Sequence, residues 1–190
     1  MNETELGLEF QAPPGWVCWA PGLSPEALRQ MAEASDGAKA EEATLAIASL
    51  DEMARADDSV DICGLWFPET AQHRIAATLL VRTYPSHEPA EEQVAEYLKI
   101  SEQPPPMPGC LISDYAVFDD RADLGPLICH ILLYADEKGQ PVWLTRYTVF
   151  SQTSPMCAEF DFNLINMRLA DEMHESAGLL VASARHSEGE

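Results

Sequence analysis

Residues 127–164 decide the fold of this chain, and their sequence is LICHILLYADEKGQPVWLTRYTVFSQTSPMCAEFDFNL. Residues 127–134 and 142–150 are almost entirely apolar or aromatic, and the polar segment between them contains Gly139. Apolar, β-branched runs that are separated by a glycine-bearing turn predict a β-hairpin. From Ala158 to Leu164 apolar and polar residues alternate, which predicts a third strand with one apolar face. The stretch therefore predicts a three-stranded antiparallel meander.

Length and charge limit the classes of protein that the chain can belong to. With 190 residues and 46% hydrophobic composition, we expect a single domain over residues 1–190, with flexible ends at 1–7 and 186–190. Eleven Lys and Arg residues against 32 Asp and Glu give a net charge of −21. This charge repels phosphates, so we expect no nucleic-acid partner. Solubility is the favoured explanation of the charge, and steering of a basic partner is the alternative.

The five cysteines indicate a compartment. They are odd in number and show no C-x-x-C spacing, which is typical of small buried hydrophobic residues in a reducing environment. The first five residues are acidic and lack the basic and apolar regions of a secretory signal. No apolar run approaches the roughly 20 residues that cross a bilayer. We therefore expect a cytoplasmic chain without membrane insertion.

The N-terminal half contains signals for both strands and helices. Short apolar runs at 8–10 and 16–19 predict an N-terminal strand pair or one sharply bent strand. Ser24, Pro25 and Glu26 predict a helix start, because serine caps free N–H groups and proline has no N–H to leave unpaired. A second helix is expected at about 38–56, although residues 44–47 also fit an extended segment.

The remaining segments predict more strands and two further helices. We expect antiparallel strands at 62–67 and 74–84, a helix that begins at Pro89, and a strand at 110–118 that ends in an acidic turn at 119–123. The proline-rich residues 104–109 predict a stiff crossing loop, with a polyproline ligand as the alternative. A closing helix is expected at about 165–184. The predicted fold class is α+β, with a mostly antiparallel sheet of six to seven strands and helices packed on it.

The sequence carries no catalytic, cofactor or metal signature. Two acidic groups, at 57–61 and 119–123, lack the spacing of a calcium loop, so solvated turns are expected. The five histidines lack zinc-site spacing, and there is no glycine-rich phosphate loop or nucleophile elbow. Cys129 and His130 are neighbours in a predicted strand, so their side chains point to opposite faces and cannot act together. We expect no catalytic residue, no cofactor and no metal.

Candidate ligand or partner contacts lie on the meander. Arg146 stands in an otherwise apolar strand, where its guanidinium must reach water or a carboxylate. The candidate contacts are His130, Arg146, Tyr147, Trp143 and Asp161. Because the predicted hairpin is apolar on both faces, either the chain's own helices or a partner must cover each face. The tryptophans and methionines fit core packing first, and a groove for a partner helix second.

A family resemblance rests on the order of these elements. The segment from Phe10 through Pro13-Pro14-Gly15-Trp16, the paired strands around Trp66 and Leu79, a helix, and a meander that ends in a helix resemble the PsbP-like α/β/α fold from about residue 8 to 185. Photosystem extrinsic proteins, a Ran-binding nuclear import factor, mycobacterial LpqN-type proteins and chaperones of secreted effectors share that fold. The resemblance implies a binding role and carries over no catalytic residue. The helical segment at 38–56 and the lack of a signal or lipoprotein cysteine depart from the secreted members.

Two functions follow as hypotheses. The first is a non-enzymatic cytoplasmic binding protein, an accessory or chaperone for a secreted or membrane-directed partner that is basic or offers an apolar helix. The second is a small-molecule-binding domain or enzyme with a pocket between sheet and helices. A concave pocket shared by Arg146 and a histidine would favour the second hypothesis, and a flat apolar groove would favour the first.

Overall fold

The computed structural model describes residues 7–34, 40–86, 88–102, 110–122, 125–135, 139–153 and 156–187. The strands within these ranges are β1 (Gly7–Glu9), β2 (Trp16–Trp19), β3 (Val60–Trp66), β4 (Ala77–Pro85), β5 (Cys110–Ala122), β6 (Gly125–Ala135), β7 (Pro141–Phe150), β8 (Met156–Leu164) and β9 (Arg185–Ser187). The α-helices are α1 (Pro25–Ala34), α2 (Ala40–Arg55), α3 (Ala90–Glu102) and α4 (Ala170–Ala182), and 3₁₀ turns lie at Glu69–Ala71 and Met167–Leu169.

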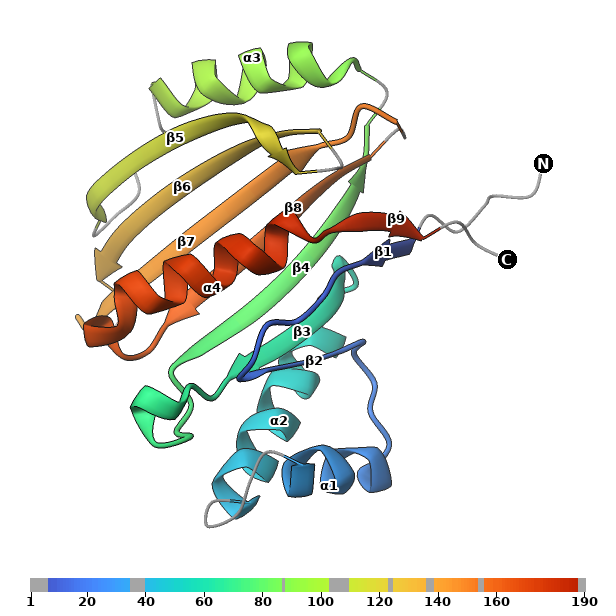
Figure 1. The fold of residues 1–190 in the computed structure, drawn as a ribbon, viewed down its shortest axis with the longest axis vertical. Coiled ribbons are helices and arrows are strands. Elements are labelled where there is room, and N and C mark those ends of the chain that lie inside the picture. The colour runs from blue at the N-terminus through green and yellow to red at the C-terminus, as the bar shows by residue number, and fades with distance from the viewer. Residues whose placement is uncertain are drawn as a thin grey trace.

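Seven of the strands form one antiparallel sheet in the order β2-β3-β4-β8-β7-β6-β5. The predicted meander is confirmed, since β7 pairs with both β6 and β8. The predicted pairing of β3 with β4 is confirmed as well. With four helices packed on this sheet, the α+β fold class is confirmed (Figure 1).

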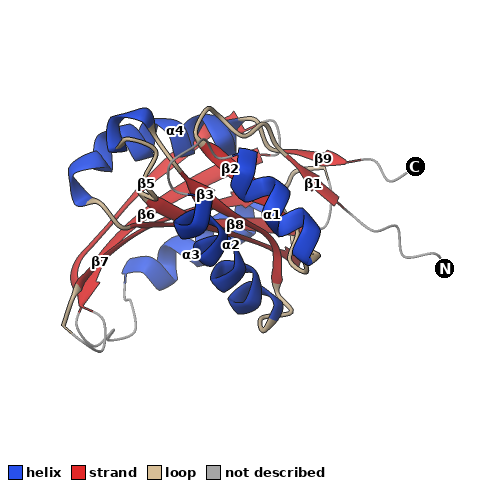
Figure 2. Ribbon diagram, turned by 90° about the horizontal axis from the view of Figure 1, so that it is seen from below, coloured by secondary structure: helices blue, strands red, loops and turns tan. Residues whose placement is uncertain are grey.

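The helices lie on both faces of the sheet. Figure 2 shows α4 and the β1–β9 pair on one face, and α1, α2 and α3 on the other. On the second face, α2 packs against β3, and α3 packs against β6 and β7. Both faces of the hairpin are thus covered in part by the chain's own helices, as its apolar character requires.

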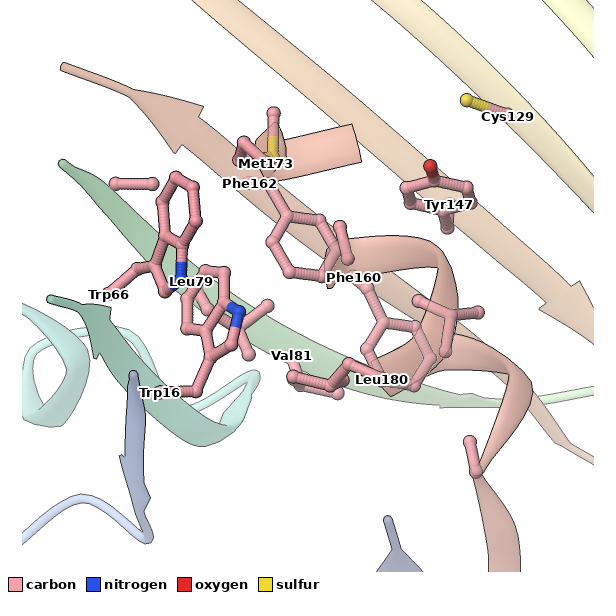
Figure 3. Packing of buried hydrophobic residues seen from close by; sticks show 14 of the residues in the cluster. Trp16, Trp66, Leu79, Val81, Cys129, Tyr147, Phe160, Phe162, Met173 and Leu180 are labelled. Atoms are coloured by element: carbon pink, nitrogen blue, oxygen red, sulfur yellow. The ribbon is translucent and has the colours of Figure 1, made fainter. Parts of the chain in front are cut away.

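The main core lies between the sheet and α4. Phe160 and Phe162, which alternate with acidic or polar neighbours in β8, have no exposed surface and face the helix (Figure 3). Met173, Ala177 and Leu180 of α4 are equally buried and lie on one face of the helix. The period of two in the strand and the helical period in α4 place these apolar side chains against one another.

Local signals correctly predicted the first two helices. Ser24 Oγ accepts a hydrogen bond from the Ala27 N–H at 3.1 Å, and Pro25 opens α1, as the capping pattern predicted. In α2, Ile47 and Leu50 are buried against Cys63 and Leu65 of β3. The helical interpretation of residues 44–47 is therefore confirmed.

One strand pairing, one turn and one helix boundary differ from the predictions. The N-terminal strand pair is wrong, because β1 pairs with β9 and β2 pairs with β3. The acidic turn is wrong over 119–122, because β5 resumes pairing after an irregularity and Ala122 lies opposite Gly125. The closing helix begins at Ala170 and not at Ile165, because Ile165 and Asn166 still donate hydrogen bonds to the Ala76 carbonyl.

Several predicted features lie outside the described residues. They are the proline-rich loop at 104–109, residue 123 of the acidic turn, and His87. Within the described part, no helix is long and apolar enough to cross a membrane.

Candidate functional site

An arginine and an aspartate form the centre of a polar cluster on the face of the sheet that carries α2 and α3. The β7–β8 register places Arg146 opposite Asp161. The guanidinium donates from Nε to Oδ1 at 2.7 Å and from Nη2 to Oδ2 at 2.9 Å. Arg82 of β4 donates from Nη1 to the same Oδ2 at 2.9 Å. Asp161, only 6% exposed, is therefore held by two arginines, and these hydrogen bonds raise the pKa of Arg146.

Two more carboxylates complete the network. Glu159 Oε1 lies 3.7 Å from Arg146 Nη1, and Asp57 Oδ2 lies 3.2 Å from Arg82 Nη2. Burial raises the pKa of Glu159, although the charges of Arg146 and Arg82 oppose this shift. Two guanidinium groups thus meet three carboxyl groups, so no net positive charge remains to attract an anion.

Hydroxyl groups surround Glu159. Tyr84 lies near the carboxyl group and helps to keep it ionised. Tyr97 reaches over from α3, and burial raises the pKa of its phenol. Thr148, the cross-strand neighbour of Glu159, has a fully buried Oγ1 without a hydrogen-bond partner of good geometry among the described residues. The cluster therefore lies between the apolar contacts of α2 and those of α3.

His130 adjoins this cluster from β6. It stands opposite Arg146 in the strand register, and its Nε2 lies 2.8 Å from Ser113 Oγ. Burial lowers the pKa of His130, and the positive charge of Arg146 lowers it further. Arg146 and a histidine thus lie on one face of the sheet. The guanidinium group of Arg146 contacts the carboxyl groups of Asp161 and Glu159 there.

The other face of the sheet holds a second group beneath α4. The rings of Trp143 and His174 lie 5.9 Å apart, centre to centre. Both side chains bond to Thr145 Oγ1, with distances of 3.2 Å from Trp143 Nε1 and 2.8 Å from His174 Nε2. Burial lowers the pKa of His174, partly offset by Asp171. Tyr147 lies beside them, buried against Phe162 (Figure 3).

A groove of about 560 Å³ lies between α4 and the strands β5, β6 and β7. It is lined by Phe118, Leu127, Tyr147, His174, Glu175, Gly178, Leu179 and Ala182. Leu179 is 61% exposed although it is a large aliphatic side chain. The groove is therefore mainly apolar, and its ionisable groups are those of His174, Glu175 and Tyr147.

A second hollow, of about 630 Å³, lies where the β1–β9 pair meets β2. Leu8, Phe10, Cys18 and Ile62 supply apolar walls. Two charged side chains at the margin of this hollow form an ion pair, in which Arg185 Nη2 lies 3.3 Å from Glu9 Oε2. This pair ties the two ends of the described chain together.

The five predicted contact residues divide between the two faces. His130, Arg146 and Asp161 gather on the α3 side, and Trp143 and Tyr147 gather on the α4 side. Their role as contacts stays a prediction. Sequence reasoning did not find Arg82, Glu159, His174 and Leu179. Arg82 carries the same signal as Arg146, a lone cation in an apolar strand, whereas the exposure of Leu179 has no local signal.

The described cysteines are poor nucleophiles. Burial raises the pKa of Cys18 and of Cys63 to about 12 and that of Cys157 to about 11. A thiol attacks as its thiolate, which is scarce at neutral pH under these conditions. Among the described residues, His, Cys, Asp and Glu side chains do not gather in groups of three that could hold a metal.

Comparisons with known proteins show a likeness at the level of the fold. The sequence matches no family description and no curated protein. A solved structure aligns with 98% of this chain and 86% of its own, with a TM-score of 0.52 and 7% sequence identity. The chain shares its fold with LpqN. LpqN is described as involved in cell envelope biogenesis of Mycobacterium tuberculosis. At this identity the likeness to LpqN shows the fold and nothing finer.

Proposed function

We propose that this chain is a non-enzymatic binding protein with an accessory role, and that the groove beside α4 receives a protein partner. The exposed Leu179 at the rim of an apolar groove supports this proposal most directly. Exposed apolar surface that continues an apolar groove is typical of sites that bind a protein or a ligand. The described thiols and the paired guanidinium groups offer little reactivity, which is consistent with a binding role.

The finer form of the proposal concerns partner and place. A cytoplasmic accessory or chaperone for a secreted or membrane-directed protein fits the cysteine usage and the charge of −21. The fold shared with LpqN, a protein of cell envelope biogenesis, is compatible with such an accessory role. The partner would present an apolar segment to the groove and basic residues to the acidic surface.

A second candidate is a small-molecule site in the same groove. Its volume of about 560 Å³ lies within the range of ligand pockets, and His174 and Tyr147 could orient a polar group of the ligand. A small molecule bound in the groove would protect a reporter at this site from cross-linking, and no second protein would be needed.

Site-specific cross-linking separates the two candidates. A photoreactive phenylalanine analogue replaces Leu179 in the full chain, and in a matched control it replaces Leu45, which is 67% exposed on α2. The proposal expects one defined protein adduct in native cells from position 179 and none from position 45. Leu179→Asp should abolish capture from a second reporter placed at Ala182. Equal labelling from both positions, or protection by a small molecule alone, would overturn it.

A further inference from the structure

The strand β5 is the long edge of the sheet. Among the described strands it pairs only with β6, and it ends the order on that side. At the other edge β2 has four residues, and both of its terminal tryptophans are buried. An edge strand directs alternate N–H and C=O groups away from the sheet, where another strand can pair with them.

The middle of β5 is unusually regular for a free edge. Residues 112–118 pair one to one with residues 133–127 of β6, and the irregularities lie before and after this segment. Seven residues in extended conformation span roughly 24 Å. Natural edges are commonly blocked by lysine, proline or a bulge. The sequence of this segment, ISDYAVF, has neither lysine nor proline and a single charged residue, Asp114.

The side chains in the middle of this segment are open to solvent on both faces of the sheet. Residues 113–117 are all exposed, and the apolar Tyr115 and Val117 each keep 39% of their surface. Tyr115 and Val117 lie opposite His130 and Ile128 of β6, on the face that carries α3. The next residue, Phe118, lines the groove beside α4. The edge is therefore continuous with the groove.

Charge decides between the occupants that an open edge could accept. A second copy paired along β5 would bring together two chains that each carry −21 and would place Asp114 of each chain near the other. A segment that bears lysine or arginine gains from this field, whereas a second copy is repelled.

The geometry points to β5 as the docking edge for an extended basic segment of a partner protein, which would add an eighth strand to the sheet. This inference rests on the proposed function, since it names the form in which the partner binds. Main-chain hydrogen bonds along residues 112–118 would supply affinity, and side chains that alternate between basic and β-branched would meet the acidic edge and the apolar Tyr115 and Val117.

The test uses the full chain and a fluorescent octapeptide of alternating lysine and valine. The same peptide N-methylated at every residue keeps its charge but cannot donate main-chain hydrogen bonds, and a glutamate–valine peptide reverses the charge. We expect binding of the first peptide only, measured by anisotropy at low salt, with slower amide exchange at residues 112–118. Val117→Lys should weaken binding about tenfold, because it adds like charge and blocks the edge. Leu45→Lys adds the same charge on α2 and should leave binding unchanged.

Equal binding by the Val117→Lys and Leu45→Lys chains, or by the N-methylated peptide, would overturn the inference, because attraction to the acidic surface alone would then suffice. A dimer in sedimentation that Val117→Lys dissociates would also overturn it and assign the edge to a second copy. If the Val117→Lys chain still captures the partner that cross-links at position 179, the proposed function stands. Only the inference that β5 is the docking edge would then be lost.

Discussion

Arg146 and Asp161 face each other across β7 and β8, and their side chains form two parallel hydrogen bonds of 2.7 and 2.9 Å. Arg82, 79 residues away from Asp161 in the chain, adds a third bond of 2.9 Å to the same carboxylate. These hydrogen bonds tie β4, β8 and β7 together on the face of the sheet that carries α2 and α3.

Asp161→Asn should destabilise the protein, because it removes the charge that neutralises two partly buried guanidinium groups. Breaking one side of a buried ion pair costs about 3 kcal/mol of unfolding free energy. Urea denaturation measures this loss. Asp58→Asn, at an exposed position, serves as the control and should change stability little. Equal stabilities of the two variants would show that the arginines are satisfied without Asp161.

Glu159 should make stability depend on pH. Its pKa is raised in the folded protein, so between the unfolded and the folded pKa the folded state binds more protons. This contribution to stability is complete below the unfolded pKa of about 4.3 and is lost as the pH rises through the folded pKa. Glu159→Gln removes the titration. The unfolding free energy of the variant relative to the parent should therefore rise from about pH 4 to pH 7. A difference that stays flat in denaturation curves across this range would contradict the prediction.

His174 should make stability depend on pH in the opposite direction to Glu159, so that stability falls as the pH falls. Its pKa is lowered, so the folded state binds fewer protons than the unfolded state as the pH falls from about 6.5 through the folded pKa, and stability is lost there. His174→Gln should lessen this loss of stability at acid pH. The imidazole proton signals in NMR should give a midpoint below that of a histidine in an unstructured peptide. A midpoint at or above the peptide value would refute the burial of the ring against Trp143.

Two glycines should respond in opposite ways to alanine. Gly125 has φ of 144°, and a Cβ there would collide with the Phe150 carbonyl oxygen. Gly125→Ala should therefore cost at least about 3 kcal/mol of unfolding free energy. Gly178 lies inside α4, and a Cβ there would meet no atom within 4 Å among the described residues. Gly178→Ala should stabilise the protein by about 0.5 to 1 kcal/mol in the same denaturation experiment. Similar effects at both positions would contradict the backbone geometry at Gly125.

Sequence patterns predicted the elements of the fold better than their ends. The alternation in β8 correctly put Phe160 and Phe162 on one face and Asp161 on the other, and the Ser24–Pro25 signal located the start of α1. The end of β5 and the start of α4 were misplaced, because pairing with Gly125 and hydrogen bonds to Ala76 decided them. The candidate site was found only in part, since Arg146 was singled out but Arg82 was not.

Local sequence patterns were enough to predict most of the strands and helices and which of their side chains share a face, because backbone period and capping depend on residues a few positions apart. Only the tertiary structure decided which strands that lie far apart in the chain are neighbours. It paired β1 with β9 across the whole chain and set β4 beside β8, so that Arg82 reaches Asp161. It also placed Leu179 of α4 and Phe118 of β5 in the wall of one groove. The pairing of strands that are far apart in the chain depends on the burial of their apolar faces together and on hydrogen bonds between their backbones. No local sequence pattern specifies which of these strands pair.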